Sequence, residues 1–284
     1  MAKIAPYMKQ LKRVYQNRLS LLGLMIVGLI IVTAVFAPFI APYDPIEQNY
    51  DALMLPPSTG HIMGTDDLGR DIFSRVVYGS RYALIIGVAV VILELIIGAF
   101  FGFVAGYFGR FIGAFIMRVV DMVLSIPVIV LALAIAGALG GGLFVMIIAI
   151  AFAGWGEFAR LVRGQVLSVK ENTYVEAARA VGARHWHIIF KHLLPNCLGP
   201  VIVYATLYMP TAILWSAALS FLGLGAQPPT PEWGAIIADG RSFLASAWWI
   251  STFPGVAIMF ATLGFNFLGD GLRDALDPKF ERQL

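Results

Sequence analysis

Long runs of apolar residues, separated by short polar stretches, make up most of the chain. Five runs approach or exceed the ~20 residues that a helix needs to cross ~30 Å of hydrocarbon, and they cover residues 19–40, 82–108, 119–139, 197–224 and 248–268. A sixth run, 143–158, is shorter and follows Gly140, Gly141 and Gly142, so we expect it to form the second arm of a tight helical hairpin. The pattern predicts an all-α protein with six transmembrane helices.

Composition places this pattern in a lipid bilayer. Hydrophobic residues make up 59% of the chain and charged residues 13%, whereas roughly 25% of residues are charged in soluble domains. The first run is too long for a signal peptide, and Pro38 and Pro42 leave no clean cleavage site. We expect a cytoplasmic segment over 1–18, a six-helix domain over 19–269 and a cytoplasmic tail over 270–284.

Lys and Arg residues orient the predicted helices, because positive charge is retained on the cytoplasmic side. With the N-terminus inside, sixteen of the twenty Lys and Arg residues fall in the cytoplasm, and the four outside are Arg70, Arg75, Arg81 and Arg241. The bias predicts that both termini are cytoplasmic. It also accounts for the basic pI without nucleic acid as a partner.

The cytoplasmic segment 157–197 has a helical pattern of its own, and residues 176–196 read EAARAVGARHWHIIFKHLLPN. Its apolar positions step by three and four, as on one face of a helix: Val175, Ala178, Gly182, Trp186, Ile189 and Leu193. We expect two short helices that meet near Gly182, with Pro195 ending the second. Such a segment is either a lever that another protein grips or a basic helix on anionic lipid.

Metal ligation is not expected in this segment. His185 and His187, two residues apart, point to different sides of a helix, and His192 and Cys197 do not complete a set with metal-ligand spacing. Cys197 is also the single cysteine of the chain, which excludes an intramolecular disulfide.

Glu94 is an isolated charge near the centre of the second predicted span. A charge there costs about 2.5–3.5 kcal/mol, so Glu94 should face the bundle or a wet cavity, or be protonated. It either lines a translocation path or makes a hydrogen-bonded contact to a neighbouring helix. Asp121 is expected to pair with Arg118 within one turn. Three prolines should kink the third, fifth and sixth spans: Pro127, Pro210 and Pro254.

The first outer loop carries a second amphipathic pattern. Leu68, Ile72 and Val76 form a stripe at spacing four. Asp66 and Arg70, like Asp71 and Arg75, have the i,i+4 spacing of ion pairs, and Thr65 or Asp66 suits an N-cap. We expect a separate surface helix here that either docks a partner or fixes the start of the second span.

The second outer loop, 223–247, is predicted to be irregular. Pro228, Pro229 and Pro231 rule out a helix where it begins. The tryptophans of this region, Trp233, Trp248 and Trp249, suit the level of the lipid headgroups. The loop either anchors to the membrane surface or contacts an outer partner.

Several of these stretches resemble a known family. Glu176, Ala177 and Ala178, then Gly182, then Leu194 and Pro195 resemble the EAA loop of permease subunits in bacterial ATP-binding-cassette importers, although His192 stands where that pattern usually has Ile. Residues 64–81, 221–234 and 268–278 resemble the peptide and nickel permeases, most closely the C component of dipeptide and oligopeptide systems.

The resemblance implies a type I importer permease fold and a transport role without enzymatic activity. It implies that Glu176, Ala177, Ala178, Gly182, Leu194 and Pro195 couple the chain to separate ATPase subunits, which bind the ATP. No Lys in the chain follows a Gly, so the phosphate-binding loop GxxxxGK[ST] is absent. No cofactor is therefore expected in this chain.

The implied partners are a second related permease, two ATPase subunits and an extracytoplasmic substrate-binding protein. The implied substrate is a di- or oligopeptide crossing the bacterial plasma membrane, with nickel or another small solute as the alternative. An ion-coupled secondary transporter is a further alternative, but we find no internal repeat of the kind common in that class.

Overall fold

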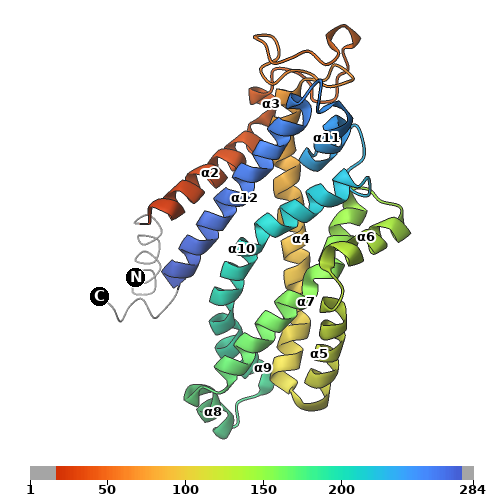
Figure 1. Ribbon diagram of the computed structural model, residues 1–284. Helices are drawn as coiled ribbons and strands as arrows, with labels where there is room; N and C mark the ends of the chain where they lie inside the picture. The colour runs from red at the N-terminus through yellow and green to blue at the C-terminus, as the bar shows by residue number, and fades with distance from the viewer. Residues whose placement is uncertain (1–16, 277–284) are drawn as a thin grey trace.

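The computed structural model describes residues 17–276, and regular structure within this range is helical, without a named strand (Figure 1). The long helices are α2 (Arg18–Val35), α4 (Ile72–Phe108), α5 (Arg110–Leu124), α6 (Val128–Leu139), α7 (Leu143–Lys170), α10 (Leu194–Phe221) and α12 (Trp249–Leu276). Short elements join them: α3 (Ala37–Ile40), η1 (Tyr50–Ala52), α8 (Thr173–Ala180), α9 (His185–Ile188), η2 (Ile189–Leu193), α11 (Trp233–Gly240) and η3 (Arg241–Phe243).

The long helices are compatible with the predicted six crossings. Five helices in the described residues are long and apolar enough to cross a bilayer, and α5 with α6, bent by 85° at the break between them, makes a sixth if the pair is one span. Pro127 is the N-cap of α6, so the kink predicted there is a break in the helix. Pro210 and Pro254 lie inside α10 and α12, which both remain continuous.

A row of glycines lets α4 pack closely on α7, which it crosses at the centre of the bundle (Figure 1). Gly98, Gly102 and Gly106 lie four residues apart on one face of α4. A Cβ built on Gly98 would lie 2.6 Å from the carbonyl oxygen of Trp155, and one on Gly106 would lie 2.8 Å from Cβ of Val166. Small residues at this spacing bring helix backbones together in membranes.

The prediction of a separate surface helix in the first outer loop is wrong. The second span begins earlier than its apolar run, at Ile72, and Asp71 is its N-cap, with the Ser74 amide donating to Asp71 Oδ2 at 2.7 Å. Thr65 and Asp66 lie in the preceding loop. Ile72 and Val76 therefore belong to the first turns of α4. Because Asp71 caps the helix at this point, the amphipathic stretch and the apolar run that follows it form one continuous helix.

Ion pairs join this loop and the first turn of α4 to the half-buried Asp239 of α11. The predicted pair of Asp66 and Arg70 is present, with Nε to Oδ2 at 2.6 Å. The predicted pair of Asp71 and Arg75 is absent, since Asp71 caps α4 and contacts His61, while Arg75 lies 3.7 Å from Asp66 and 3.8 Å from Asp239. Burial raises the pKa of Asp239, against the opposing effect of both arginines.

The second outer loop, predicted to be irregular, contains the helix α11. It begins after the prolines, with Glu232 as N-cap: the Ala235 amide donates to Glu232 Oε2 at 2.9 Å. The tryptophans also differ from the prediction. Trp233 and Trp249 are buried and donate to the carbonyls of Val76 and Thr65, both at 3.0 Å, and only Trp248 is exposed. Their indoles bind this end of the bundle together.

Candidate coupling segment and interior carboxyl

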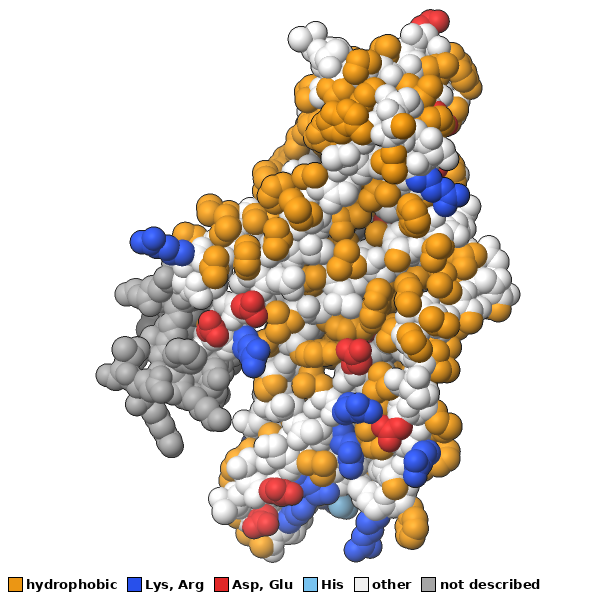
Figure 2. All heavy atoms as spheres, in the orientation of Figure 1, with side chains coloured by type: hydrophobic (Ala, Val, Ile, Leu, Met, Phe, Trp, Pro, Cys, Tyr) orange, Lys and Arg blue, Asp and Glu red, His pale blue; other side chains and the backbone are white. Residues whose placement is uncertain are grey.

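The segment that contains α8 and α9 projects at the end of the bundle opposite α3 and α11 (Figure 1). Helix α7 continues to Lys170, so the first part of the predicted segment 157–197 is helical and continuous with α7. Figure 2 shows that most of the Lys and Arg side chains on the visible face lie toward this end.

Two short helices meet at Gly182, as predicted. The Gly182 amide donates to the Arg179 carbonyl at 2.9 Å and the Ala183 amide to the Ala178 carbonyl at 3.0 Å. These two bonds form a Schellman motif at the end of α8, which places Gly182 at φ +80°. A residue with a side chain is strained there, so the glycine fixes the angle between α8 and α9.

Pro195 does not end the second helix. A π-helical turn, η2, links α9 directly to α10, and the Leu194 amide donates to the carbonyl of Ile189, five residues back. Pro195 lies in the first turn of α10. The wider turn changes the hydrogen-bond register where the proline lacks its N–H, so the chain runs from the short segment into the membrane as one rigid element.

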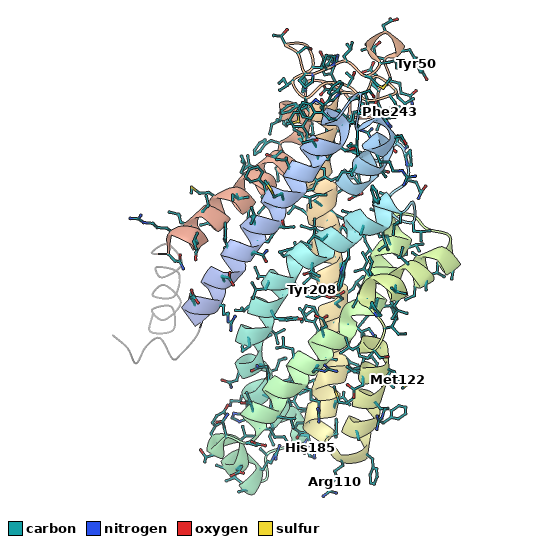
Figure 3. All side chains as sticks on the ribbon, in the orientation of Figure 1. Tyr50, Arg110, Met122, His185, Tyr208 and Phe243 are labelled. Carbon is teal, nitrogen blue, oxygen red and sulfur yellow. The ribbon has the colours of Figure 1, made fainter. Side chains whose placement is uncertain are left out.

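The inner face of the segment is anchored to α4 and α7. Val175, Ile188 and Leu193 are buried in a cluster with Tyr107 and Val166. Polar contacts strengthen the joint, because the Tyr107 hydroxyl is hydrogen-bonded to His185 Nδ1 at 2.5 Å, and Lys170 Nζ donates to the Tyr107 carbonyl at 2.7 Å. His185 is labelled at this end in Figure 3. The segment is therefore packed directly against two long helices.

The outer face of the segment is apolar and exposed. Val181 is 84% exposed, Trp186 70% and Phe190 59%, and the last two rings stack with centroids 5.8 Å apart. The prediction that Trp186 shares the buried face is wrong, because the turn at Gly182 changes the helical phase and Ile188 is buried instead. The structure therefore presents a compact apolar surface, bounded by charged side chains, which a protein partner could cover.

The residues matched to the EAA pattern lie around this surface. Glu176, Ala177, Gly182, Leu194 and Pro195 are exposed. Ala178 is half-buried, next to the anchored face.

Glu94 lies where α4, α7 and α10 meet and is fully buried. Its Oε1 and the hydroxyl of Tyr208 both lie next to Gly154. A side chain at position 154 would occupy the space between them and the helix, because a Cβ built there would contact both groups. In the described residues neither carboxylate oxygen of Glu94 has a hydrogen-bond partner, and the Tyr208 hydroxyl has none either. Tyr208 lies midway along the bundle in Figure 3.

Asp121 pairs with a different arginine from the one predicted. Its Oδ1 lies 2.8 Å from Nη2 of Arg160 on α7, so the pair joins two helices. In the described residues, no group of three or more His, Cys, Asp or Glu side chains is placed to hold a metal ion.

Comparisons with known proteins agree on one family. Residues 98–282 match the model described as binding-protein-dependent transport system inner membrane component, and residues 7–57 match the N-terminal transmembrane domain of oligopeptide transport permease C. The dipeptide transport system permease protein of Alkalihalophilus pseudofirmus is 48% identical over 98% of this chain and 91% of its own length. The di/tripeptide transport system permease protein of Pseudomonas aeruginosa is 45% identical over 97% of this chain and 94% of its own length.

A solved structure is similar in fold. The inward-facing MetNI methionine ABC transporter aligns with a TM-score of 0.58 at 21% identity, over 72% of this chain and 98% of the transporter chain. At that identity the likeness concerns the fold alone.

Proposed function

This chain belongs to the family of binding-protein-dependent transport system inner membrane components, and from that premise we propose that it carries di- and oligopeptides across the bacterial plasma membrane. The family consists of multi-pass permease subunits that are not themselves enzymes. The observation that carries the peptide assignment is the 48% identity, along nearly the whole chain, to a relative named as a dipeptide permease.

Coupling to ATP is assigned to the α8–α9 segment. Glu176, Ala177, Ala178, Gly182, Leu194 and Pro195 form its contact with an ATPase subunit, around the exposed Val181, Trp186 and Phe190. The buried contacts of Val175 and Leu193 support this role, since a surface that transmits force must be fixed to the helices it moves. A helix lying on lipid would not require such an anchor.

Importers of this family act with separate ATPase and substrate-binding proteins. The assembly proposed here contains this chain, a second related permease, two cytoplasmic ATPase subunits that bind the ATP, and an extracytoplasmic binding protein. Both termini and the α8–α9 segment lie in the cytoplasm, as the charge bias supports. Glu94 lines the translocation path.

The substrate is tested by uptake. A strain that lacks the gene for this chain, complemented with the native gene, should accumulate a labelled dipeptide, and uptake should stop when ATP is depleted but continue when only the proton gradient is removed. Accumulation of nickel without peptide would replace the peptide by the metal as cargo. Loss with the proton gradient alone would favour a secondary transporter.

The coupling surface is tested by co-purification from the native membrane. The native chain should bring an ATPase and a second permease with it, whereas Trp186→Asp and the double variant Glu176→Lys with Gly182→Asp should lose the ATPase and keep the permease. Asp51→Asn, an exposed change in the loop at the other end of the bundle, is the matched control. Retention of the ATPase by both variants would remove the segment from the coupling contact.

A further inference from the structure

Two acidic side chains and two tyrosines form a polar track where α4, α7 and α10 meet. At its inner end, Glu94 is 0% exposed and Tyr208 5% exposed, and both border Gly154. At its other end, Tyr204 donates from its hydroxyl to Glu157 Oε2 at 2.6 Å. The two tyrosine rings connect the ends, with centroids 5.8 Å apart, because they lie four residues apart on α10.

The track begins at a cavity of about 400 Å³. Glu157 and Tyr204 line that cavity, and the rest of its wall comes from Leu124, Arg160, Leu161, Gly164 and Gln165. Arg160 is already engaged by Asp121 at 2.8 Å. A molecule in the cavity would therefore meet the Glu157 carboxylate and the exposed Arg160–Asp121 pair, and Glu94 of α4 lies deeper, against α7 and α10.

The charges of the track are not compensated by the chain. No ion pair in residues 17–276 includes Glu94 or Glu157, and neither oxygen of Glu94 accepts a hydrogen bond from a described residue. Buried polar groups are nearly always hydrogen-bonded, and the Tyr208 hydroxyl beside Glu94 can donate to it, but that hydroxyl is neutral. A cationic partner for the two carboxylates therefore has to come from outside the described residues.

Aromatic rings narrow the chemistry of that partner. Phe158 packs edge-on against Tyr204 and Tyr208 with centroids 5.1 and 5.2 Å away, and Trp215 packs against Tyr208 at 5.8 Å. Carboxylates combined with aromatic faces attract an ammonium group by charge, by hydrogen bonding and by cation–π interaction. A carboxylate or phosphate ligand would be repelled by both glutamates.

We propose that Glu157 and Glu94 are successive binding points for a primary ammonium group of the peptide in transit, Glu157 at the cavity and Glu94 in the interior. The inference rests on the peptide transport proposed above and adds the group of the substrate that the membrane subunit binds. The Tyr204 hydroxyl positions the Glu157 carboxylate, and the Tyr208 hydroxyl lies beside Glu94.

Transport by the complete complex in vesicles tests the role of each carboxylate. Glu94→Gln and Glu157→Gln should each lower the maximal uptake rate of Ala–Ala about tenfold, the loss expected when one charge-assisted hydrogen bond disappears. ATP hydrolysis should continue, so that fewer peptides cross per ATP. Glu94→Asp should retain more uptake than Glu94→Gln, and Asp51→Asn should match the native chain. Native uptake by Glu94→Gln would overturn the inference.

Carbodiimide labelling of the native complex tests the ligand directly and does not depend on a folded variant. Mass spectrometry should show that Ala–Ala, present with ATP and the binding protein, protects Glu157 and Glu94 from modification, whereas N-acetyl-Ala–Ala does not. N-acetyl-Lys–Ala separates the α-amine from a side-chain amine, because its protection would mean that any primary ammonium is bound. Glu232, buried on α11 away from the track, is the internal control.

The two proposals fail in different ways. If the native complex imports no peptide, the proposed function is wrong and the inference falls with it. If the native complex imports Ala–Ala while N-acetyl-Ala–Ala protects Glu94 equally well, the ammonium site is wrong and peptide transport stands.

Discussion

Two places in this chain bury charged side chains, and they differ in how the charge is compensated. Near α11, Arg75 is 1% exposed and lies between Asp66 and Asp239, while Arg70 pairs with Asp66 at 2.6 Å. Between α4, α7 and α10, Glu94 is equally buried and has no partner among the described residues. In the first set each charge has an opposite charge beside it, although Arg75 Nε makes no hydrogen bond, whereas Glu94 has no opposite charge beside it among the described residues.

Removal of Arg75 should have the largest effect on stability. Arg75→Met leaves Asp66 and Asp239 with less positive charge in a buried site, and breaking a buried pair in this way costs about 3–5 kcal/mol. Thermal unfolding of the complex purified from its native membrane measures the loss. Arg118→Met on α5, at an exposed position, is the control and should unfold like the native protein. Equal melting temperatures for the two variants would mean that the Arg75 pairs are not structural.

Removal of Glu94 should increase the stability of the protein, the opposite of the effect expected for Arg75. Glu94→Met replaces an uncompensated carboxyl by an apolar side chain of similar length, so it should stabilise the protein by about 1–3 kcal/mol, in keeping with the cost of a charge at that depth. Peptide uptake should be lost at the same time. Lower stability together with retained uptake would show that Glu94 is a structural residue after all, comparable to Arg75.

Gly154 provides a steric test of the Glu94 site. Gly154→Ala places a Cβ against Glu94 Oε1 and within 2.9 Å of the Tyr208 hydroxyl, and overpacking of this kind costs about 1–3 kcal/mol. Gly164→Ala on the same helix meets nothing within 4 Å and is the matched control. Shortening Glu94 to Ala should recover much of the loss in the double variant, since the two changes affect the same space. Additive costs would place the clash elsewhere.

The elements that the sequence predicts correctly depend on local signals. Apolar runs predicted the long helices, and the glycine at position 182 predicted the turn between α8 and α9, because its positive φ is a property of one residue. The burial of Trp233 could not be predicted, because the indole reaches the carbonyl of Val76 on a helix far away in the sequence. The prediction of a separate outer helix was wrong for a related reason. Periodicity indicates which face of a helix is buried but not the residue at which the helix begins, which the Asp71 cap determines. Glu94 could be singled out by its charge, but Tyr208 and Gly154 have no such signal.

Glu232 completes the comparison as a buried carboxyl with its own donor, and changes there should be the smallest. It accepts a hydrogen bond from the Ala235 amide, so Glu232→Gln should be nearly neutral and Glu232→Ala should lose about 1 kcal/mol, as for other N-caps.

Burial raises the pKa of Glu232 in the folded state, where backbone hydrogen bonds only partly oppose the shift. The folded chain therefore holds this proton more tightly than the unfolded chain, and the associated stability is full below the ordinary glutamate pKa and declines as the pH rises above it. The free energy of unfolding, measured across that pH range, should fall as the pH rises in the native protein. This dependence should be absent in Glu232→Gln. The same slope in native protein and variant would assign the pH dependence to other groups.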